Sequence, residues 1–444
     1  MRTSSLRRFA VPLLCLPIVG ACDSTTEPEE QRLVNVLLDF CANDTPVWFA
    51  FRNQDADWVR VNPDAEGTFA LTATNRVILA FTRLDGASPH TEIVYAHNME
   101  LETISGRACL EETGSVQVNG SVTGVGAGEL AQVSANFETV FVDPEVQTAF
   151  ELSQLPARPV DIVASRVSVD GPSHASNRVI IRRSFPPTNN ATLQPLDFSV
   201  VSTEVFTPTT ATLSITGATG AGGYVLSNFF SQLETSHELT YLDGLPPSSV
   251  SVTAIPTAQL AEGDYHSVFA VVFDASGNAR GAQRYFRAPA VLPMPIAGEA
   301  PIPAISAIAS APYLRLRASA QRPTAYGGAF NIEYMQTQSI SERRVTVTMT
   351  RLYHSGGGTW TVDVPDLSSV AGWQNGWGLQ SGGSAIDWTA IVIGGRGELA
   401  LGAPPEDGEG LPFATFSSSA AAAEAYRVTR SPSALRPRLF GRAR

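Results

Sequence analysis

The sequence predicts an all-β protein built from tandem antiparallel β-sandwiches with few short helices. Apolar and polar residues alternate with a period of two in many short segments, which is typical of half-buried strands. Clusters of Gly, Pro, Asn and Asp separate these segments at short intervals, as hairpin and sandwich loops require. Strands and helices do not alternate as in βαβ units, so a nucleotide-binding α/β sheet is not expected.

The alternation is clear near residue 116, where Val116 and Val118 flank Gln117. It returns at residues 133–141, 250–254, 314–317 and 345–349. Helical signals are few. Asp143 followed by Pro144 is typical of a helix start and predicts a short helix over residues 144–153. The alanine-rich residues 417–428 predict a second helix.

The N-terminus has the pattern of an export signal. Arg2, Arg7 and Arg8 precede a short apolar run that is too short to cross a membrane, and the run ends in Val-Gly-Ala-Cys at Cys22. This pattern resembles the lipobox of bacterial lipoproteins. The resemblance implies cleavage after residue 21, lipidation of Cys22 and an envelope location, periplasmic or surface-exposed, anchored to the outer or the inner membrane.

Two cysteines remain once Cys15 leaves with the signal and Cys22 carries lipid. In an oxidising envelope, Cys41 and Cys109 most simply pair as a disulfide, which stabilises the fold by about 4 kcal/mol in the chain-entropy model. The alternative is a reactive thiol or a metal pair, and neither cysteine has a Cys-x-x-Cys partner or a neighbouring His.

The expected domain organisation follows from these signals and from composition. The expected segments are the signal peptide 1–21, an acidic tether 22–31, sandwiches at 32–155 (with the disulfide) and 156–289, a Pro/Ala-rich connector 290–312 that pairs at a sheet edge, a third, Trp-rich β domain 313–416, and a basic tail 417–444. Residues 250–287 resemble the last hairpin of immunoglobulin-like or fibronectin-like domains.

Composition excludes several mechanisms. All 30 basic residues are arginine, so there is no phosphate-loop lysine, Schiff-base lysine or kinase lysine. The six histidines are isolated, no Gly-x-Ser-x-Gly is present, and the sequence predicts no metal and no cofactor. All 42 acidic residues precede the arginine-rich last residues, and an acidic body argues against nucleic-acid binding.

The most suggestive binding feature is aromatic. Trp373 and Trp377 flank Gln374 and Asn375 in a glycine-rich loop. Indole faces stack on sugar C–H groups and amides bond hydroxyls, so this loop is a candidate carbohydrate site. The alternative is that the indoles close the end of a small sandwich.

Together these features predict a lipid-anchored, non-enzymatic binding or structural module, resembling multidomain β-sandwich envelope lipoproteins. Its expected partners are the membrane, through the anchor, and an envelope protein or polysaccharide. Carbohydrate binding through the tryptophan loop is the alternative function, and a hydrolase with acids or a metal gathered from separate strands is the third.

Overall fold

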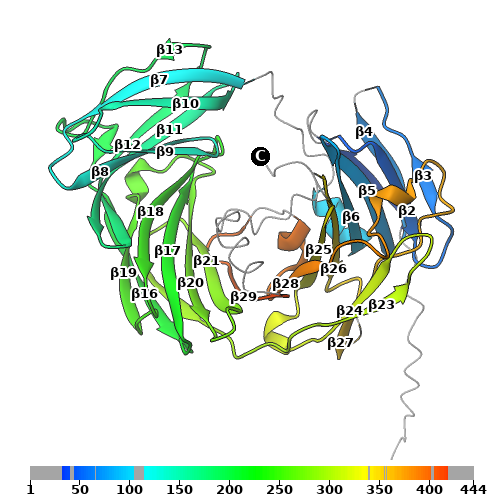
Figure 1. Ribbon diagram of the computed structural model, residues 1–444. Helices are drawn as coiled ribbons and strands as arrows, with labels where there is room; N and C mark the ends of the chain where they lie inside the picture. Colours follow the sequence, from blue (N-terminus) through cyan, green and yellow to red (C-terminus); the bar gives the residue numbers. More distant parts are fainter. Residues whose placement is uncertain are drawn as a thin grey trace, which may run out of the picture. The chain divides into compact units, whose positions relative to one another are not determined.

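The computed structural model describes residues 33–40, 45–65, 67–104, 115–338, 341–354, 356, 358–401 and 405–418. Within these ranges it contains 29 strands, one α-helix and four short 3-10 turns, which confirms the predicted all-β class and its β-sandwich domains (Figure 1). Cys22, Cys41 and Cys109 lie outside the described residues, as do the tether and residues 419–444.

The first group of strands precedes the α-helix. Its elements are β1 (Val34–Asp39), β2 (Trp48–Asn53), β3 (Val59–Val61), β4 (Thr68–Ala73), β5 (Arg76–Asp85), β6 (Ser88–His97) and α1 (Asn98–Ile104). β1 pairs with β4, and β3, β2, β5 and β6 pair in that order. The β5–β6 hairpin turns at Gly86, whose φ of 58° is a backbone conformation that favours glycine.

The second group forms a sandwich around a core of its own. Its strands are β7 (Ser115–Thr123), β8 (Glu129–Ala135), β9 (Glu138–Val142), β10 (Ala149–Pro156), β11 (Val160–Asp170), β12 (Ser173–Phe185), β13 (Ala191–Thr192), β14 (Leu196–Asp197) and β15 (Val205–Phe206). β7 and β10 contribute Val118 and Leu152 to one side of this core, and β8 and β11 contribute Val133 and Ile162 to the other.

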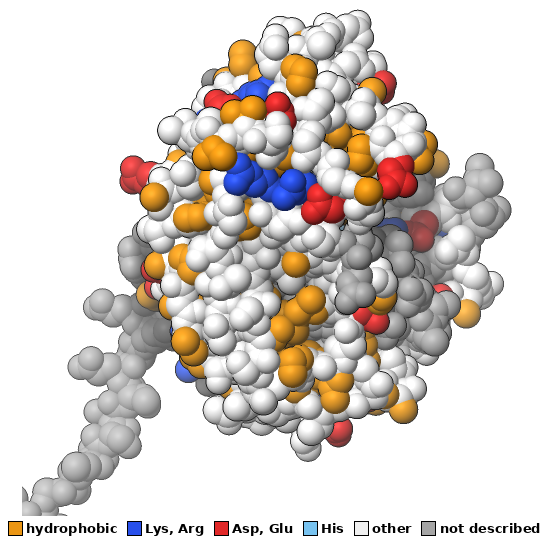
Figure 2. All heavy atoms as spheres, turned by 90° about the vertical axis from the view of Figure 1, so that its left-hand side faces the viewer, with side chains coloured by type: hydrophobic (Ala, Val, Ile, Leu, Met, Phe, Trp, Pro, Cys, Tyr) orange, Lys and Arg blue, Asp and Glu red, His pale blue; other side chains and the backbone are white. Residues whose placement is uncertain are grey.

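The third group is also a sandwich. Its elements are β16 (Thr209–Thr216), β17 (Gly222–Phe230), β18 (Ser236–Asp243), β19 (Ser249–Ala254), η1 (Thr257–Gln259), β20 (Tyr265–Phe273), β21 (Ala279–Phe286) and β22 (Val291–Pro295). The sheet β19–β16–β22 packs Leu213 and Met294 against Val268 and Val272 of β20. Its outward positions carry small hydroxyl residues such as Ser214, and Figure 2 shows few charged side chains over the part of the surface to which β16 and β19 belong.

The fourth group closes the described chain. Its elements are β23 (Ala304–Ala309), β24 (Arg315–Gln321), η2 (Thr324–Tyr326), β25 (Ala329–Gln338), β26 (Ser341–Thr350), β27 (Thr359–Asp363), η3 (Asn375–Trp377), β28 (Asp387–Ile393), η4 (Gly397–Leu401) and β29 (Gly410–Ser417). β26 pairs in parallel with β6, and β29 pairs with β21. The first and fourth groups therefore share one core, which contains Trp48 and Ile93 as well as Trp360 and Trp377.

The expected domain boundaries fall differently relative to these cores. The boundary at 155/156 falls before the last residue of β10, and β10 and β11 flank a single core. The boundary at 289/290 precedes β22, whose Leu292 and Met294 complete the core of the third group. The Pro/Ala-rich residues 290–312 contain β22 and β23, and both pair at the edge of a sheet, as the sequence predicted.

The helix expected over residues 144–153 is wrong. A single turn follows Asp143, in which the Gln147 amide donates to the Asp143 carbonyl, and the chain then enters β10. Phe150 and Leu152 alternate with exposed residues in β10 and are buried against the sandwich core, so tertiary burial overrides the local start signal. Of the other expected helix, Ser417 ends β29 and residues from 419 onward are not described.

An ionic network connects the second group to the third. Arg183 of β12 donates to Asp161 of β11 (2.9 Å) and to Asp264, which precedes β20 (2.5 Å). Asp264 is fully buried and also accepts the backbone N–H groups of Gln232 and Ala261, at 2.8 Å each. A buried carboxylate with this many donors holds its neighbours in fixed positions.

We expect the substitution Asp264→Ala to lower the free energy of unfolding by about 3–5 kcal/mol, because Arg183 loses one of its two carboxylate partners and two backbone amides lose their acceptor. The matched control is Glu204→Ala, since Glu204 is 52% exposed and lies 3.7 Å from Arg182. A surface pair of this kind contributes less than about 1 kcal/mol. Urea denaturation measures both, and equal losses in the two variants would contradict the proposed role of Asp264.

Candidate functional site

The tryptophan loop lies over the core shared by the first and fourth groups. Trp377 is buried and Trp373 is half-buried, whereas Gln374 and Asn375 are exposed. The Trp373 ring lies 5.1 Å from the ring of Trp48 and 5.5 Å from that of Trp377, measured between centroids.

Further contacts hold this loop in place. The Trp48 indole N–H donates to the Ala371 carbonyl (3.1 Å), and Tyr313 contacts Trp373 with a centroid separation of 5.5 Å. Three aromatic residues therefore surround the Trp373 ring. A sugar that stacked on it would have to use the part of the indole that these neighbours leave uncovered, beside the exposed amides.

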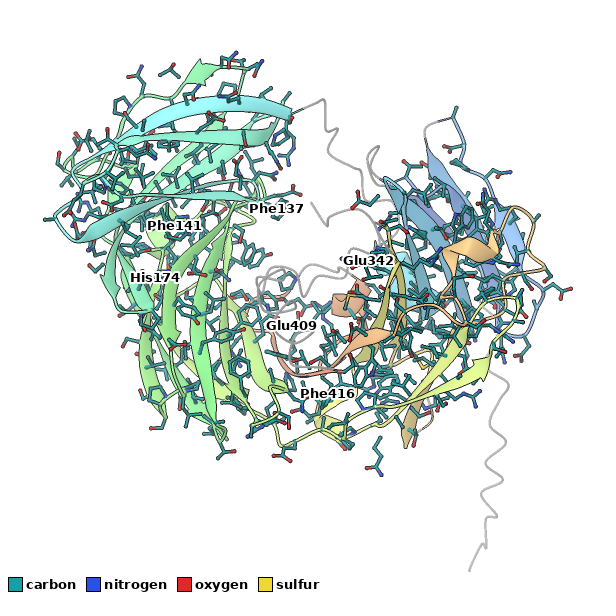
Figure 3. The ribbon with its side chains drawn as sticks, in the orientation of Figure 1. Phe137, Phe141, His174, Glu342, Glu409 and Phe416 are labelled. Atoms are coloured by element: carbon teal, nitrogen blue, oxygen red, sulfur yellow. The ribbon has the colours of Figure 1, made fainter. Side chains whose placement is uncertain are left out.

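A second aromatic surface crosses the second and third groups. We call it the aromatic ladder; its members are Phe141 of β9, His174 of β12, Tyr241 of β18, Tyr224 of β17 and Phe273 of β20. Successive ring centroids lie 6.4, 5.9, 5.8 and 5.8 Å apart along this order. Phe141 is 56% exposed and the other four are half-buried (Phe141 and His174 are marked in Figure 3).

Strand register explains why these rings meet. His174 lies directly opposite Tyr241 across the β12–β18 pair. Tyr224 lies two residues from Gly222 on β17, and Gly222 is paired with Phe273. Residues two apart share a face of a strand, so Tyr224 and Phe273 lie on the same face of the sheet.

The charged groups that contact the ladder in the described part of the chain are acidic. The Glu238 carboxylate lies 2.6 Å from Nε2 of His174. The Tyr241 hydroxyl donates to Asp243 at 3.4 Å, and burial together with this carboxylate raises the pKa of Tyr241. The ladder thus combines half-exposed rings with carboxylate and hydroxyl acceptors, which suits an uncharged ligand rich in hydroxyl groups.

Among the described carboxyl groups, Glu100 has the pKa that burial shifts most clearly. Burial raises its pKa to about 7, which is the range of a catalytic acid. Its oxygens accept the His97 amide and the Thr350 hydroxyl, and a Cβ on Gly397 would lie 2.6 Å from Oε1. The carboxyl is enclosed and completes a capping box at the start of α1, so its role is structural.

Comparisons with known proteins assign no family. No protein-family model and no curated protein matches the chain. The Bacillus anthracis TIE protein is 8% identical over 59% of this chain and 50% of its own, with a TM-score of 0.15. The chain therefore spans half the length of that protein. A tetra-tandem repeat from the extending region of a large adhesion protein is 11% identical over 87% and 95%, with a TM-score of 0.13. Such low TM-scores carry no argument about function.

Two further findings concern the described residues alone. No helix among them has the length and apolar character that a membrane crossing requires. No group of three or more His, Cys, Asp and Glu side chains within the same ranges is arranged to hold a metal ion.

Two buried histidines, His237 and His266, are neutral near pH 7. His237 contacts the hydroxyls of Ser134 (2.8 Å) and Ser165 (2.9 Å), and burial lowers its pKa to about 3, with a further contribution from His174. His266 accepts the Ile255 amide at Nε2 (2.9 Å), and burial lowers its pKa to about 4.

We expect the free energy of unfolding to fall as the pH is lowered from about 6.5 toward 4, by up to about 1.4 kcal/mol per pH unit for each histidine. The free energy of unfolding falls because both histidines bind protons below pH 6.5 in the unfolded chain. In the folded chain they stay unprotonated until the pH reaches their pKa values of about 3 and 4. Urea denaturation of His237→Gln should show a shallower slope between pH 6 and 5. An unchanged slope would contradict this assignment.

Proposed function

We propose that this chain is a lipid-anchored envelope protein that binds a linear, uncharged polysaccharide along the aromatic ladder. The ladder is the observation that carries the proposal. Its exposed member, Phe141, places a large apolar ring in water. The residue belongs to β9, which pairs with β8. An exposed ring that continues into four further aromatic side chains is typical of a binding surface.

Ring chemistry favours a sugar. Tyrosine and phenylalanine offer large apolar contact areas, and ordering them on binding costs little conformational entropy. The C–H groups of a pyranose pack on such rings. The hydroxyl of Tyr241 and the carboxylate of Asp243 can accept hydrogen bonds from the sugar hydroxyls beside them.

Charge favours an uncharged polymer. Glu238 and Asp243 repel uronate, sulfate and phosphate groups, and the acidic composition of the chain acts in the same direction. Nucleic acids are disfavoured for the same reason. Adjacent strands in a sheet are about 4.8 Å apart, so rings contributed by five strands form an elongated surface. Such a surface favours an extended chain over a single sugar.

Anchoring follows from the N-terminal sequence. A lipidated Cys22 would hold the protein at a membrane, and the polar residues 23–31 would separate the sandwiches from the lipid surface. A tethered binding module of this kind links an envelope membrane to a polymer and needs no catalytic group.

Lipidation is tested by the substitution Cys22→Ser. We expect it to move the protein from the membrane fraction to the soluble fraction and to abolish incorporation of a labelled fatty acid. The substitution removes the residue that would carry the lipid, and stable anchoring needs several acyl chains. The matched control is Cys15→Ser, which should remain membrane-bound and labelled. Labelling that survives Cys22→Ser would overturn the anchor.

Polysaccharide binding is tested by calorimetry of the detergent-solubilised protein with soluble, linear neutral glucans and galactans. We expect saturable binding that weakens about tenfold in Tyr241→Ala, since a lost contact of about 1.4 kcal/mol changes an equilibrium constant tenfold. Tyr241→Phe keeps the ring and should retain most of the affinity. A linear polyuronate should not bind.

Two controls locate the site. Val201→Ala changes a side chain that is 81% exposed and outside the ladder, and it should bind as the parent does. Binding that is lost in Trp373→Ala but kept in Tyr241→Ala would assign the sugar to the tryptophan loop instead. No binding to any neutral glycan by the folded parent protein would overturn the proposal.

A further inference from the structure

We infer that the open edge of β23 is a self-association surface, on which two copies of this chain pair their β23 strands in antiparallel fashion. β23 is the terminal strand of the sheet β23–β24–β27 and pairs with β24. In the described part of the chain, no other backbone hydrogen bond involves residues 304–309. Its outer row of N–H and C=O groups is therefore available to a further strand.

Two other edge strands, β22 and β27, carry features that usually prevent such pairing. β22 contains Pro293 and Pro295, which lack the N–H groups that a partner strand would need. β27, at the opposite edge of the same sheet, ends at Asp363, which forms an ion pair with Arg317. Charges and prolines of this kind are the common protection of sheet edges.

β23 has neither protection. Its sequence is Ala-Ile-Ser-Ala-Ile-Ala, and no charged residue occurs between Glu299 and Arg315. Four of its six residues are exposed, including Ile308 at 37%, and the preceding Ile302 is 61% exposed. An uncharged, partly apolar edge of this composition gains from being covered by a similar edge.

Symmetry favours a second copy as the occupant. In an antiparallel pair, residues directly opposite each other point to the same face of the sheet. A two-fold axis perpendicular to the sheet keeps each side chain on its own face, so the axis must pass beside a residue that lies opposite its own copy. An axis at Ser306 sets Ser306 opposite Ser306 of the partner subunit. It also sets Ile305 opposite Ala307 and Ala304 opposite Ile308, so each large side chain meets a small one and no like charges face each other.

The strength of this contact is limited by the bulge at Ile308, where the register with β24 shifts between Ala307 and Ala309. Bulges bend the edge and shorten the segment that can pair. The dimer is therefore expected to be reversible and concentration-dependent. It would join two three-stranded sheets into one of six strands.

A charge exchange at Ser306 tests the pairing by sedimentation velocity of the detergent-solubilised full chain. The parent protein should shift from monomer toward dimer as its concentration rises. Ser306→Lys and Ser306→Glu should each remain monomeric, because the axis brings two like charges together. An equimolar mixture of the two variants should form dimers again.

The matched control is Ser214→Lys, which places the same charge on an exposed outward position of the central strand β16 and should dimerise as the parent does. Near-ultraviolet circular dichroism checks that every variant is folded. A parent that stays monomeric at all concentrations, a Ser306→Lys variant that still dimerises, or a mixture that stays monomeric would each overturn the inference. The affinity for an oligosaccharide too short to reach two ladders should be the same in the monomeric variants and in the parent, which separates this inference from the proposed function.

Discussion

The parallel pairing of β6 with β26 is the interaction on which much of the described structure depends. It sets Thr346 beside Glu92 and Met349 beside Tyr95, residues that are about 250 positions apart in the chain. The entropy cost of closing so long a loop grows only with the logarithm of its length, so many buried side chains can offset it. The shared core supplies them, since Trp48 and Ile93 pack with Trp360 and Val347.

The same pairing decides what the aromatic residues do. Trp48 reaches the tryptophan loop because the first and fourth groups share a core, and its contact with Trp373 makes that loop part of the packing. Phe141 is 56% exposed, whereas Tyr241 is half-buried and packs beside a small apolar cluster that includes Leu226 and Phe269. Aromatic content alone therefore does not identify a binding surface, because the tertiary partner of each ring determines whether it is buried.

Local pattern accounts for the strands but not for their partners. The alternation at residues 116–119, 250–254 and 345–349 correctly predicts β7, β19 and β26. The same alternation at Phe150 and Leu152 is short and follows the helix-start signal at Asp143. Burial of both side chains nevertheless favours a strand over a helix at these residues. The short helix α1 was missed although His97 and Glu100 form a capping box, because the box contains His in place of the usual Ser or Thr.

Register is the reason why the aromatic ladder could not be predicted from the sequence. Its five members come from five strands, and no spacing along the chain relates His174 to Tyr241 or Phe141. The signal that remains visible is an aromatic residue at an outward position of an alternating segment, as at Phe141 between Val140 and Val142. Such a residue indicates a surface, but only strand pairing shows which other rings extend it.

The ladder and the edge of β23 lie on different groups of strands, so ligand binding and self-association can be varied separately. Two copies joined at β23 would carry two ladders, and a long polymer that met the first would meet the second at a high effective concentration. Avidity of this kind raises the retention of a polymer without any tighter contact at either ladder. A weak edge contact and a weak sugar contact can therefore together give firm attachment that still reverses when either one is lost.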